Sequence, residues 1–511
     1  MPVLSWLTRK DDLKAAGKAA YRLLREEPDL SAGDPETGNM IIQGDNLEAL
    51  KALLPFYAGQ VKCIYIDPPY NTGSAFDQYD DNLEHTIWLS IMYPRLELLH
   101  ELLAKDGAIF IQLDDNEHAY ARVMCDEIMG RNNFVANVVW QKRTSPDNRL
   151  RLGNAQDYIL VYVKNKGTEK NFNQLDVNKT RLKDFKNPDN DPRGPWASTD
   201  CTAQAGHATK EQFYVLTTPA GRIIELPDSL CWRFTEKRMQ EEIATGRIWF
   251  GKNGQGVPRK KTYLSEIQGQ NAWTWWTNEE VGHNQEAKKE INELFGANNP
   301  FETPKPERLI QRIIHLATNP GDIVMDSFLG SGTTAAVAQK MGRRYIGIEM
   351  GEHAKTHCAL RLQKIIDGEQ GGISKSVGWH GGGGFRFYTL GETVFDENGQ
   401  IRESIKFDHL AAHIWFYETK TPFKKPKKRA AALGVHDGTA YALLYNGILH
   451  DQRVDGGNVL TSKTLDTILA GLGKAAYKKL VIYGEATRLG PNKLDRLSIE
   501  FKQTPYDVRT R

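Results

Sequence analysis

Short apolar runs alternate with amphipathic stretches in the first part of the chain. Met40–Gln43 and Val61–Ile66 are strand-like runs, and the stretch Leu47–Leu54 between them has helical spacing. A longer amphipathic stretch around residues 83–103 precedes the apolar run Gly107–Leu113. Because apolar runs of this length are typical of buried parallel strands, the alternation predicts an α/β fold with a doubly wound, mostly parallel sheet.

Regions on either side of this alternation have other patterns. Near the N-terminus, the spacing of apolar residues in Leu13–Leu24 predicts a helix. Gly381–Gly384 indicates either a flexible connection or a crowded turn, and the alternation in Phe385–Tyr388 predicts a strand. Apolar runs at 439–444 and 479–483 then predict a small C-terminal α/β unit.

The first candidate for chemistry is the tetrapeptide Asp67-Pro68-Pro69-Tyr70, which follows the run Val61–Ile66. Two consecutive prolines fix the backbone and end the strand. The rigid turn directs the Asp67 carboxylate and the Pro68 carbonyl outward as two acceptors, with the Tyr70 ring beside them. Two acceptors and a flat ring suit the exocyclic amino group of a planar base. A loop that only turns sharply is the alternative, and the tetrapeptide alone does not decide.

A second motif follows the first after about 260 residues. The apolar run Asp322–Asp326 leads into Gly330-Ser331-Gly332, a helical stretch follows, and the run Arg344–Glu349 ends on a carboxylate. This order is typical of nucleotide-binding βαβ units, in which glycines let the backbone approach the ligand and a terminal acid accepts from ribose hydroxyls. No Gly-Lys-Ser/Thr follows the glycines, so the turn is not a phosphate loop.

Polar residues and glycine therefore gather at or just past the ends of predicted strands. Ligands of doubly wound sheets bind at the carboxyl ends of the strands, near a topological switch point. The residues at these ends are Asp45, Asp67, Asp114, Gly330 and Glu349. We interpret this coincidence as an active site.

Both motifs resemble those of the amino-group DNA methyltransferases that use S-adenosylmethionine, and the order of catalytic motif before cofactor motif resembles their β class. The likeness extends to the modification (Mod) subunits of type III restriction–modification systems. The further blocks that carry it are Gly44–Leu50, Ile64–Gly73, Asn133-Phe134 with Val138–Lys142, and Lys305–Ile310.

The resemblance implies a methyltransferase fold with permuted motif order and a role for each matching residue. Asp67, Pro68, Pro69 and Tyr70 would be catalytic. Glu349 would hold the ribose hydroxyls of S-adenosylmethionine and Asp45 its adenine amino group. The full set of implied cofactor-binding residues is Asp45, Lys305, Pro306, Asp326, Phe328, Gly330, Gly332, Thr333 and Glu349. An ordinary capped helix is the alternative for Lys305.

The region between the motifs has few helical patterns and many turn residues. Basic and aromatic residues interleave in Trp232-Arg233-Phe234 and Arg247-Ile248-Trp249-Phe250, and Lys and Arg modestly exceed Asp and Glu. Cations can contact phosphate, whereas Asn, Gln and Arg can read base edges. A solvated irregular insertion is the alternative. The position between the motifs favours target recognition, in which Trp273–Trp276 could stack bases or form core.

Composition limits these interpretations without changing them. The net charge of +2 requires any nucleic-acid surface to be a local patch. The chain has no apolar stretch of membrane-spanning length and no secretory h-region, so we expect a cytoplasmic protein without membrane contact. The scattered cysteines fit reduced thiols better than disulfides or a metal site, and we expect no metal. They are Cys63, Cys125, Cys201, Cys231 and Cys358.

We therefore expect an enzyme that methylates N6 of a flipped adenine in double-stranded DNA. The choice of adenine over cytosine N4 comes from the resemblance alone. A methyltransferase acting on RNA or on a protein amide, and a DNA-binding specificity subunit with an inactive site, are the other hypotheses. The resemblance also implies a homodimer. Since the sequence has no Gly-x-x-x-x-Gly-Lys-Ser/Thr motif, restriction would need a separate helicase and nuclease subunit.

These inferences divide the chain into six predicted parts. They are an N-terminal helical segment (1–38), the methyltransferase domain with the catalytic motif (39–140), an inserted target-recognition domain (141–300), the methyltransferase domain with the cofactor motif (301–366), a Gly-rich connection (367–400) and a C-terminal α/β domain (401–511).

Overall fold

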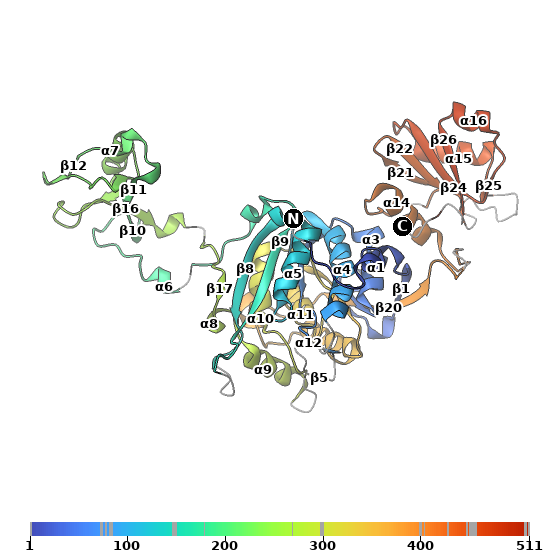
Figure 1. Cartoon of the computed structure of the whole chain (residues 1–511), viewed down its shortest axis with the longest axis horizontal. Coiled ribbons are helices and arrows are strands. Elements are labelled where there is room, and N and C mark those ends of the chain that lie inside the picture. Colours follow the sequence, from blue (N-terminus) through green and yellow to red (C-terminus); the bar gives the residue numbers. More distant parts are fainter. Residues whose placement is uncertain are drawn as a thin grey trace. The chain divides into compact units, whose positions relative to one another are not determined.

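The computed structural model divides the chain into two compact units, Met1–Asn173 with Trp273–Arg511, and Gln174–Ala272 (Figure 1). The described residues are 3–71, 75–76, 79–80, 85–145, 151–177, 179–267, 269–296, 301–397, 401–402, 404–426, 429–445, 448, 457–504 and 508. The start predicted near residue 83 for one helix and residues 72–73 of a resembling block lie outside the described residues.

The larger unit contains an eleven-stranded sheet. In spatial order the strands are β1 (Arg22–Glu26), β20 (Gly384–Thr393), β3 (Met40–Gln43), β19 (Arg344–Glu349), β18 (Ile323–Asp326), β4 (Val61–Ile66), β7 (Leu103–Leu113), β9 (Gln156–Val163), β8 (Phe134–Gln141) and β17 (Trp275–Trp276), with β2 (Ala32–Gly33) paired to β20. The strands from β20 to β7 are parallel, whereas β9 is antiparallel to both neighbours. The predicted doubly wound, mostly parallel α/β sheet is thus confirmed.

Helices cover both faces of this sheet (Figure 1). Their bounds are α1 (Arg9–Asp12), α2 (Ala15–Lys18), α3 (Asn46–Tyr57), α4 (His85–Leu102), α5 (His118–Cys125), α8 (Asn278–Val281), α9 (Asn284–Phe295), α10 (Glu307–Ala317), α11 (Thr333–Lys340), α12 (Leu360–Ile366) and α13 (Ser374–Val377). β5 (Ala75–Phe76) pairs antiparallel with β6 (Tyr79–Asp80). Residues of α3, α4 and α5 share one core cluster with the sheet. Helices α10 and α11 contact the same strands without contributing to that cluster, which places them on the opposite face.

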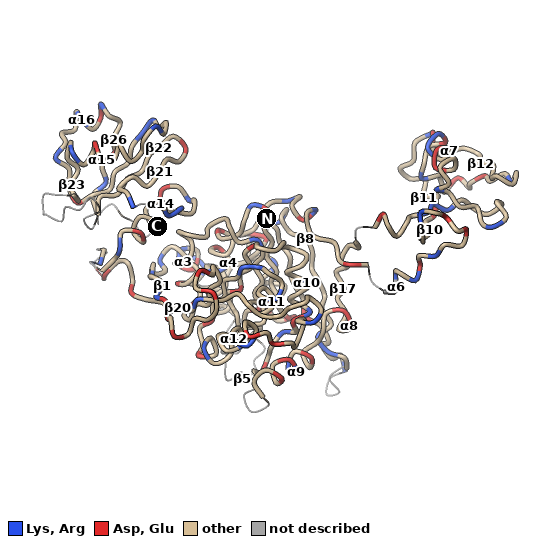
Figure 2. The backbone as a smooth tube through the Cα atoms, turned by 180° about the vertical axis from the view of Figure 1, so that it is seen from behind, with Lys and Arg blue, Asp and Glu red and all other residues tan. Residues whose placement is uncertain are grey.

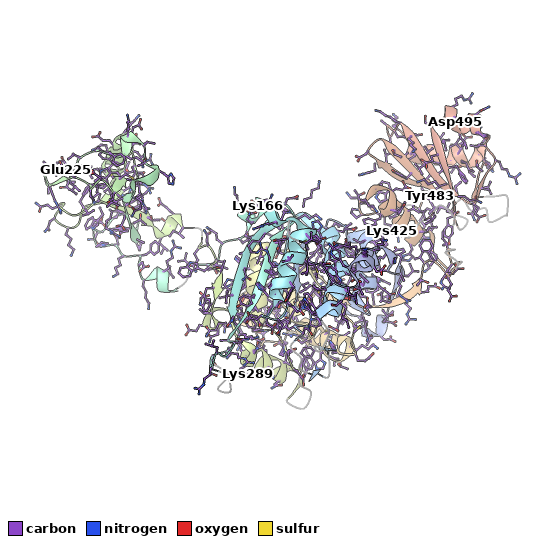
Figure 3. All side chains as sticks on the ribbon, in the orientation of Figure 1. Lys166, Glu225, Lys289, Lys425, Tyr483 and Asp495 are labelled. Carbon is purple, nitrogen blue, oxygen red and sulfur yellow. The ribbon has the colours of Figure 1, made fainter. Side chains whose placement is uncertain are left out.

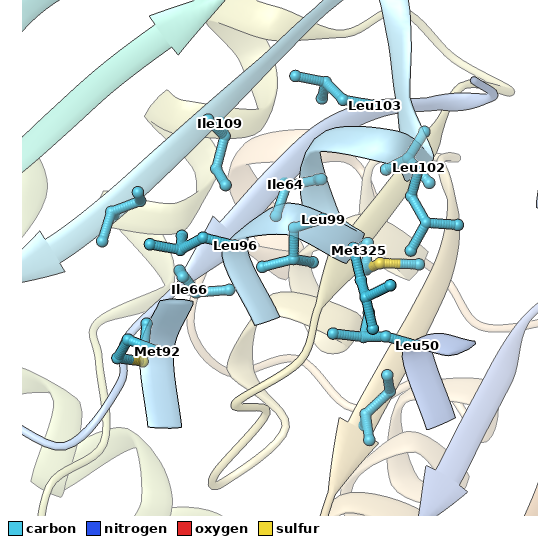
Figure 4. Packing of buried hydrophobic residues seen from close by; sticks show 14 of the residues in the cluster. Leu50, Ile64, Ile66, Met92, Leu96, Leu99, Leu102, Leu103, Ile109 and Met325 are labelled. Atoms are coloured by element: carbon cyan, nitrogen blue, oxygen red, sulfur yellow. The ribbon is translucent and has the colours of Figure 1, made fainter. Parts of the chain in front are cut away.

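The core beneath α4 explains why the amphipathic stretch there forms a helix. Figure 4 shows Met92, Leu96 and Leu99 of α4 directed toward Ile64 of β4 and Ile109 of β7. All five side chains are buried. Since full burial of one such side chain contributes roughly 1.5–3 kcal/mol, this face of α4 fixes the helix on the strands that lead to the candidate site.

The helix predicted over Leu13–Leu24 is wrong. Two short helices, α1 and α2, end by Lys18, and Arg22–Glu26 forms β1, antiparallel to β20. Lys51 Nζ donates to the carbonyls of Gly17 and Ala19 at 2.6 and 2.5 Å, which takes acceptors that a continuing helix would use. Pairing with β20 therefore outweighs the local helical spacing.

The glycine run at 381–384 is a crowded turn and not a loose connection. Gly381, Gly382 and Gly383 have φ of +100°, +99° and +76°. A Cβ on Gly381 would lie 2.7 Å from the Ile366 carbonyl oxygen, so a side chain cannot be accommodated there. The turn leads into β20, which places this strand of the central sheet beyond the boundary predicted at residue 366.

The C-terminal residues form a second sheet within the larger unit. Its strands are β21 (Ala432–His436), β22 (Thr439–Leu443), β24 (Lys479–Gly484) and β26 (Ile499–Gln503), with β23 (Val459–Leu460) paired to β25 (Ala486–Thr487). Its helices are α14 (Phe407–Thr419), α15 (Ser462–Leu472) and α16 (Pro491–Arg496). Both predicted apolar runs, 439–444 and 479–483, lie in parallel neighbours of this sheet. Lys425 and Arg429, which follow α14, pair with Asp408.

The smaller unit, Gln174–Ala272, has short antiparallel strands and its own core. Its elements are α6 (Lys179–Leu182), β10 (Trp196–Asp200), β11 (Thr202–Gln204), β12 (Leu216–Thr217), β13 (Ile223–Ile224), β14 (Leu230–Trp232), α7 (Glu236–Ala244), β15 (Ile248–Trp249) and β16 (Arg259–Tyr263). Trp232 and Met239 are fully buried in this core, and Lys261 is buried against Asp189 and Asp191. Residues 141–173 and 273–300 of the predicted insertion belong to the larger unit.

Neighbouring strands β18 and β4 leave the sheet in opposite directions. β18 connects through α11 to β19 on one side, and β4 connects through α4 to β7 on the other. A cleft opens at such a switch point outside the carboxyl ends of the strands. Asp326 ends β18 and Asp67 follows β4 directly, so both carboxylates lie at this position.

Candidate active site

Asp67 is held by two side chains at the start of the proline turn. Its Oδ1 accepts a hydrogen bond from Tyr70 Oη at 2.7 Å, and its Oδ2 forms an ion pair with Lys305 Nζ. Burial raises the pKa of the Asp67 carboxyl, although the Lys305 charge and the two hydrogen bonds oppose the shift. A carboxylate whose partners are side chains can exchange them for the donors of a ligand.

The turn itself is fixed by its neighbours as well as by its prolines. Trp88 Nε1 of α4 donates to the Pro69 carbonyl at 2.7 Å. Among the described residues, none donates a hydrogen bond to the Pro68 carbonyl, which stays available as an acceptor beside Asp67. The two acceptors that the sequence predicted are therefore adjacent and rigidly held.

A second buried carboxylate, Asp157 of the antiparallel strand β9, lies on the other side of Tyr70. It accepts from Tyr70 Oη at 3.3 Å and from Gln112 Nε2 at 3.1 Å, and it pairs with Lys142. The Tyr70 hydroxyl thus contacts both Asp67 and Asp157. Burial, followed by the negative charge of Asp157, raises the pKa of Tyr70, so the phenol stays protonated and donates.

The loop after β18 is folded around Asp326. Its Oδ1 accepts from the Phe328 amide at 3.0 Å and its Oδ2 from Thr334 Oγ1 at 2.6 Å. Burial raises the pKa of Asp326 to about 7. Gly332 has φ of +81°, and a Cβ there would lie 3.2 Å from Cys358 Cα, so the turn requires glycine.

Glu349, at the end of β19, holds the same loop from its other side. It accepts from the amides of Gly330 at 2.7 Å and Gly351 at 3.0 Å, and His353 Nε2 lies 2.9 Å from its Oε1. The carboxylate is buried. It therefore ties the glycine turn to the neighbouring strand.

Both loops open on one cavity of about 760 Å³. Most predicted site residues line it, namely Asp67, Pro68, Pro69, Tyr70, Lys305, Asp326, Phe328, Gly330 and Thr333. Four others do not appear in the lining, namely Asp45, Pro306, Gly332 and Glu349. Two motifs that are far apart in the sequence thus meet at a single cavity of the size that ligand sites have.

Asp45 is not part of the cavity lining, but it stabilises elements that contact the lining. Its side chain caps α3 by accepting from the Leu47 amide at 2.8 Å, and it pairs with Arg95 at 2.8 Å. The adjacent Asn46 donates to the Ser327 carbonyl at 2.7 Å, which links α3 to the loop after β18. Pro306 similarly adjoins Lys305 as the residue that precedes α10.

Sequence reasoning did not identify Asp157, Lys142, Gln112 or Phe301 as residues of the cavity and its support. Asp157 is buried in an otherwise apolar strand, which is the signal that could have found it, because a charge is buried only when it is paired. Phe301 and Lys288 come from segments that only the fold brings to the cavity.

The fold and the cavity define an α/β protein with a cavity at a topological switch point, lined on one side by the Asp67 carboxylate and Pro68. Residues 61–359, more than half of the chain, match the family described as DNA methylase, and the chain belongs to this family. The predicted resemblance is thereby confirmed.

Known relatives agree with this assignment. The chain is 37% identical over 334 residues to the type III restriction–modification enzyme StyLTI Mod subunit of Salmonella typhimurium, covering 60% of this chain and 50% of that protein. It is 34% identical over 437 residues to the probable HindVI Mod subunit of Haemophilus influenzae, covering 74% of this chain and 56% of that protein. The chain thus spans about half the length of these relatives.

A solved structure is also similar to this chain. It is TTHA0409 of Thermus thermophilus, described as a putative DNA modification methylase complexed with S-adenosyl-L-methionine. The identity is 17% and the TM-score 0.33, with 69% of this chain and 100% of that chain covered.

No helix in the part of the chain that the structure describes is long and apolar enough to span a membrane. Within the same residues, no group of three or more His, Cys, Asp or Glu side chains could hold a metal ion. The five cysteines are buried, free thiols.

Proposed function

We propose that the protein is an S-adenosylmethionine-dependent DNA methyltransferase that modifies N6 of adenine in double-stranded DNA. One observation carries the proposal. The Asp67–Pro68 acceptor pair and the glycine turn after β18 open on the same cavity, so a planar amino-bearing base and a nucleoside cofactor can meet there. Membership in the DNA methylase family supports the same reaction class.

The residues that line the cavity fit S-adenosylmethionine. The molecule combines a positively charged sulfonium centre with a flat adenine and a polar amino-acid end. Asp326 supplies a carboxyl group, Phe301 and Phe328 supply aromatic surface, and Thr333 supplies a hydroxyl. We assign Phe328, Gly330, Gly332, Thr333, Asp326, Glu349, Asp45, Lys305 and Pro306 to its binding or to the support of its site. When bound, the cofactor supplies an electrophilic methyl group.

The chain's own residues would prepare the amino group. A base that stays stacked in a duplex cannot enter the cavity, so it must leave the stack. Asp67 and the Pro68 carbonyl would accept hydrogen bonds from the amino hydrogens, which draws the nitrogen lone pair out of conjugation with the ring. Tyr70, held through its hydroxyl by Asp67 and Asp157, would stack on the base. Fixed geometry of this kind supplies much of the rate enhancement.

The choice of adenine follows the relatives. Mod subunits are named among them, and a further relative, 24% identical over 347 residues, is the DNA adenine methyltransferase YhdJ of Escherichia coli. We infer that the smaller unit, with its interleaved cations and aromatics, takes part in target recognition. A homodimer and a separate restriction subunit complete the proposal, since the relatives are named as subunits of restriction–modification enzymes.

Product identification tests this function. The purified protein is incubated with methyl-labelled S-adenosylmethionine and mixed-sequence duplex DNA, and the DNA is digested to nucleosides. We expect label in N6-methyladenine. Label in N4-methylcytosine would keep the reaction class and overturn the base. Labelled RNA or protein, with unlabelled DNA, would overturn the DNA substrate.

A further inference from the structure

The charges that line the cavity fall into two groups. Lys142 and Lys305 are mostly buried and paired with Asp157 and Asp67. Arg143 and Lys288 line the same cavity but are exposed, and neither forms an ion pair within the described residues. Arg143 follows β8, and Lys288 belongs to the first part of α9. We call Arg143 and Lys288 the rim cations.

The inner part of the cavity is unfavourable for phosphate. Asp67, Asp157 and Asp326 line it, and only two of these carboxylates are paired with a lysine. A nucleotide that places its base against Tyr70 must leave its sugar and flanking phosphates nearer solvent. Cations at the mouth would offset the repulsion between those phosphates and the carboxylates.

The adjacent lysines Lys288 and Lys289 of α9 have different surroundings, which argues that Lys288 is more than a solvated surface charge. Lys288 lines the cavity, whereas the next residue, Lys289, is not part of the lining. The Lys289 side chain is 79% exposed at the surface of the protein (Figure 3), and its Nζ lies 3.9 Å from Glu293 Oε1. Figure 2 shows that this helix carries both acidic and basic residues. Lys289 thus pairs within its own helix, whereas Lys288 contributes to the cavity lining.

We propose that the rim cations Arg143 and Lys288 bind the backbone phosphates that flank the nucleotide whose base enters the cavity. This inference rests on the proposed function and adds to it the part of the substrate that holds the extruded nucleotide in register. Each contact neutralises one phosphate, so it contributes to the salt dependence of binding without reading the base sequence.

The test compares a double variant with a matched control. Arg143→Ala with Lys288→Ala removes the rim cations, whereas Lys166→Ala with Lys289→Ala removes two exposed lysines outside the cavity lining. The substrate is a short duplex centred on the adenine that the wild-type protein methylates. Dissociation constants are measured across a salt series, and kcat and KM are measured at one salt concentration. Cofactor affinity and circular dichroism verify that all proteins are folded.

We expect the slope of log K against log salt to fall by about 0.9 for each lost contact, or nearly 2 in the double variant. KM for DNA should rise at least tenfold with kcat within about twofold, because the contact is equal in ground and transition states. The control should keep the wild-type slope. A rim variant with the wild-type slope and KM would overturn the inference.

Neutral phosphates locate the contact on the DNA. Methylphosphonates on either side of the target adenine should weaken wild-type binding and leave the rim variant unaffected. Equal weakening of both proteins would overturn the inference while methylation by the wild type still supports the proposed function. A wild-type protein that binds cofactor and methylates no DNA would instead overturn the proposed function, and the inference with it.

Discussion

Two neighbouring strand ends carry the same residue for different purposes. Asp67 follows β4 and Asp326 ends β18, and both line the cavity. Asp67 is held by the side chains of Tyr70 and Lys305, which a ligand can displace. Asp326 is held by the Phe328 amide of its own loop and by the Thr334 hydroxyl at the start of α11. The position at the switch point therefore does not distinguish the roles of Asp67 and Asp326. The groups that donate hydrogen bonds to each carboxylate distinguish them.

The two loops are also made rigid in different ways. Pro68 and Pro69 fix the backbone at Asp67, and Trp88 holds the second carbonyl. The loop at Asp326 depends on left-handed glycines and on internal hydrogen bonds. Substitution of Asp67 should therefore leave structure intact and remove activity, whereas substitution of Asp326 should disturb the loop.

The largest expected effect is that of Asp67→Ala. Loss of one of two preorganised acceptors should lower kcat/KM for methyl transfer by about 10³-fold or more. Cofactor affinity and the urea midpoint of unfolding should stay near wild type, because no backbone group depends on Asp67. Single-turnover methylation and calorimetric titration of the cofactor measure the two properties. A variant that loses cofactor binding as well would assign Asp67 to loop support.

Asp326→Asn should have the opposite profile. The amide cannot accept from both Phe328 and Thr334, and an unsatisfied buried donor costs about 1–3 kcal/mol. We expect cofactor affinity to fall by about tenfold, since the loop that carries Gly330 is less ordered. Loss of activity with unchanged cofactor affinity would contradict the assignment of Asp326 to the loop.

The raised pKa of Asp326 adds a pH signature to this variant. Its pKa is about 7 in the folded protein and about 3.9 when unfolded, so the folded state binds the proton more tightly between these values. Protonation therefore stabilises the fold at low pH, and this contribution is lost as pH rises from about 4 through 7. Urea midpoints at pH 5 and pH 8 should differ less in Asp326→Asn than in wild type.

Asp157→Asn tests whether the catalytic turn needs support from the antiparallel strand. The substitution keeps the shape but removes the charge that pairs with Lys142 and attracts the Tyr70 hydroxyl. A loss of about 1.4 kcal/mol, or tenfold in kcat, is expected with cofactor affinity unchanged.

Asp114→Asn is the matched control for Asp157→Asn. Asp114 also lines the cavity, but among the described residues its carboxylate accepts hydrogen bonds only from the amide and side chain of Asn116, at 2.9 and 3.0 Å. Its kcat should stay within about twofold of wild type. Equal losses of kcat in the two variants would show that activity depends on any carboxylate of the cavity, and not on the contact between Asp157 and Tyr70.

Much of the fold was predictable because its signals are local. Consecutive residues were enough to predict the apolar strands β3, β4 and β7 and the glycine turn after β18. The helix predicted over Leu13–Leu24 failed because β1 is specified by its distant partner β20. The same distinction applies to the site. Asp67 and Gly330 belong to compact motifs, whereas Asp157, Lys142 and Phe301 reach the cavity only through long-range packing.

Lys305→Met should change kcat/KM least of these variants at alkaline pH. At lower pH it should change the pH dependence of kcat/KM. The Lys305 charge lowers the pKa of Asp67 against the effect of burial, so its removal raises that pKa further. If the ionised carboxylate is the acceptor, activity falls as pH drops through the pKa, and the acid limb of kcat/KM should move to higher pH. Lys305→Arg should keep the limb close to wild type, because the charge remains.

The outcome of Lys305→Met decides which strand end controls the pH profile. Asp326, with a pKa of about 7, is the other carboxyl at the switch point that could produce an acid limb. A limb that is unchanged in Lys305→Met but lost in Asp326→Asn would assign it to loop order and not to the acceptor. If the acid limb moves in Lys305→Met but stays in Asp326→Asn, the limb reports the titration of Asp67. The two aspartates would then differ in their titration as well as in their hydrogen-bond donors.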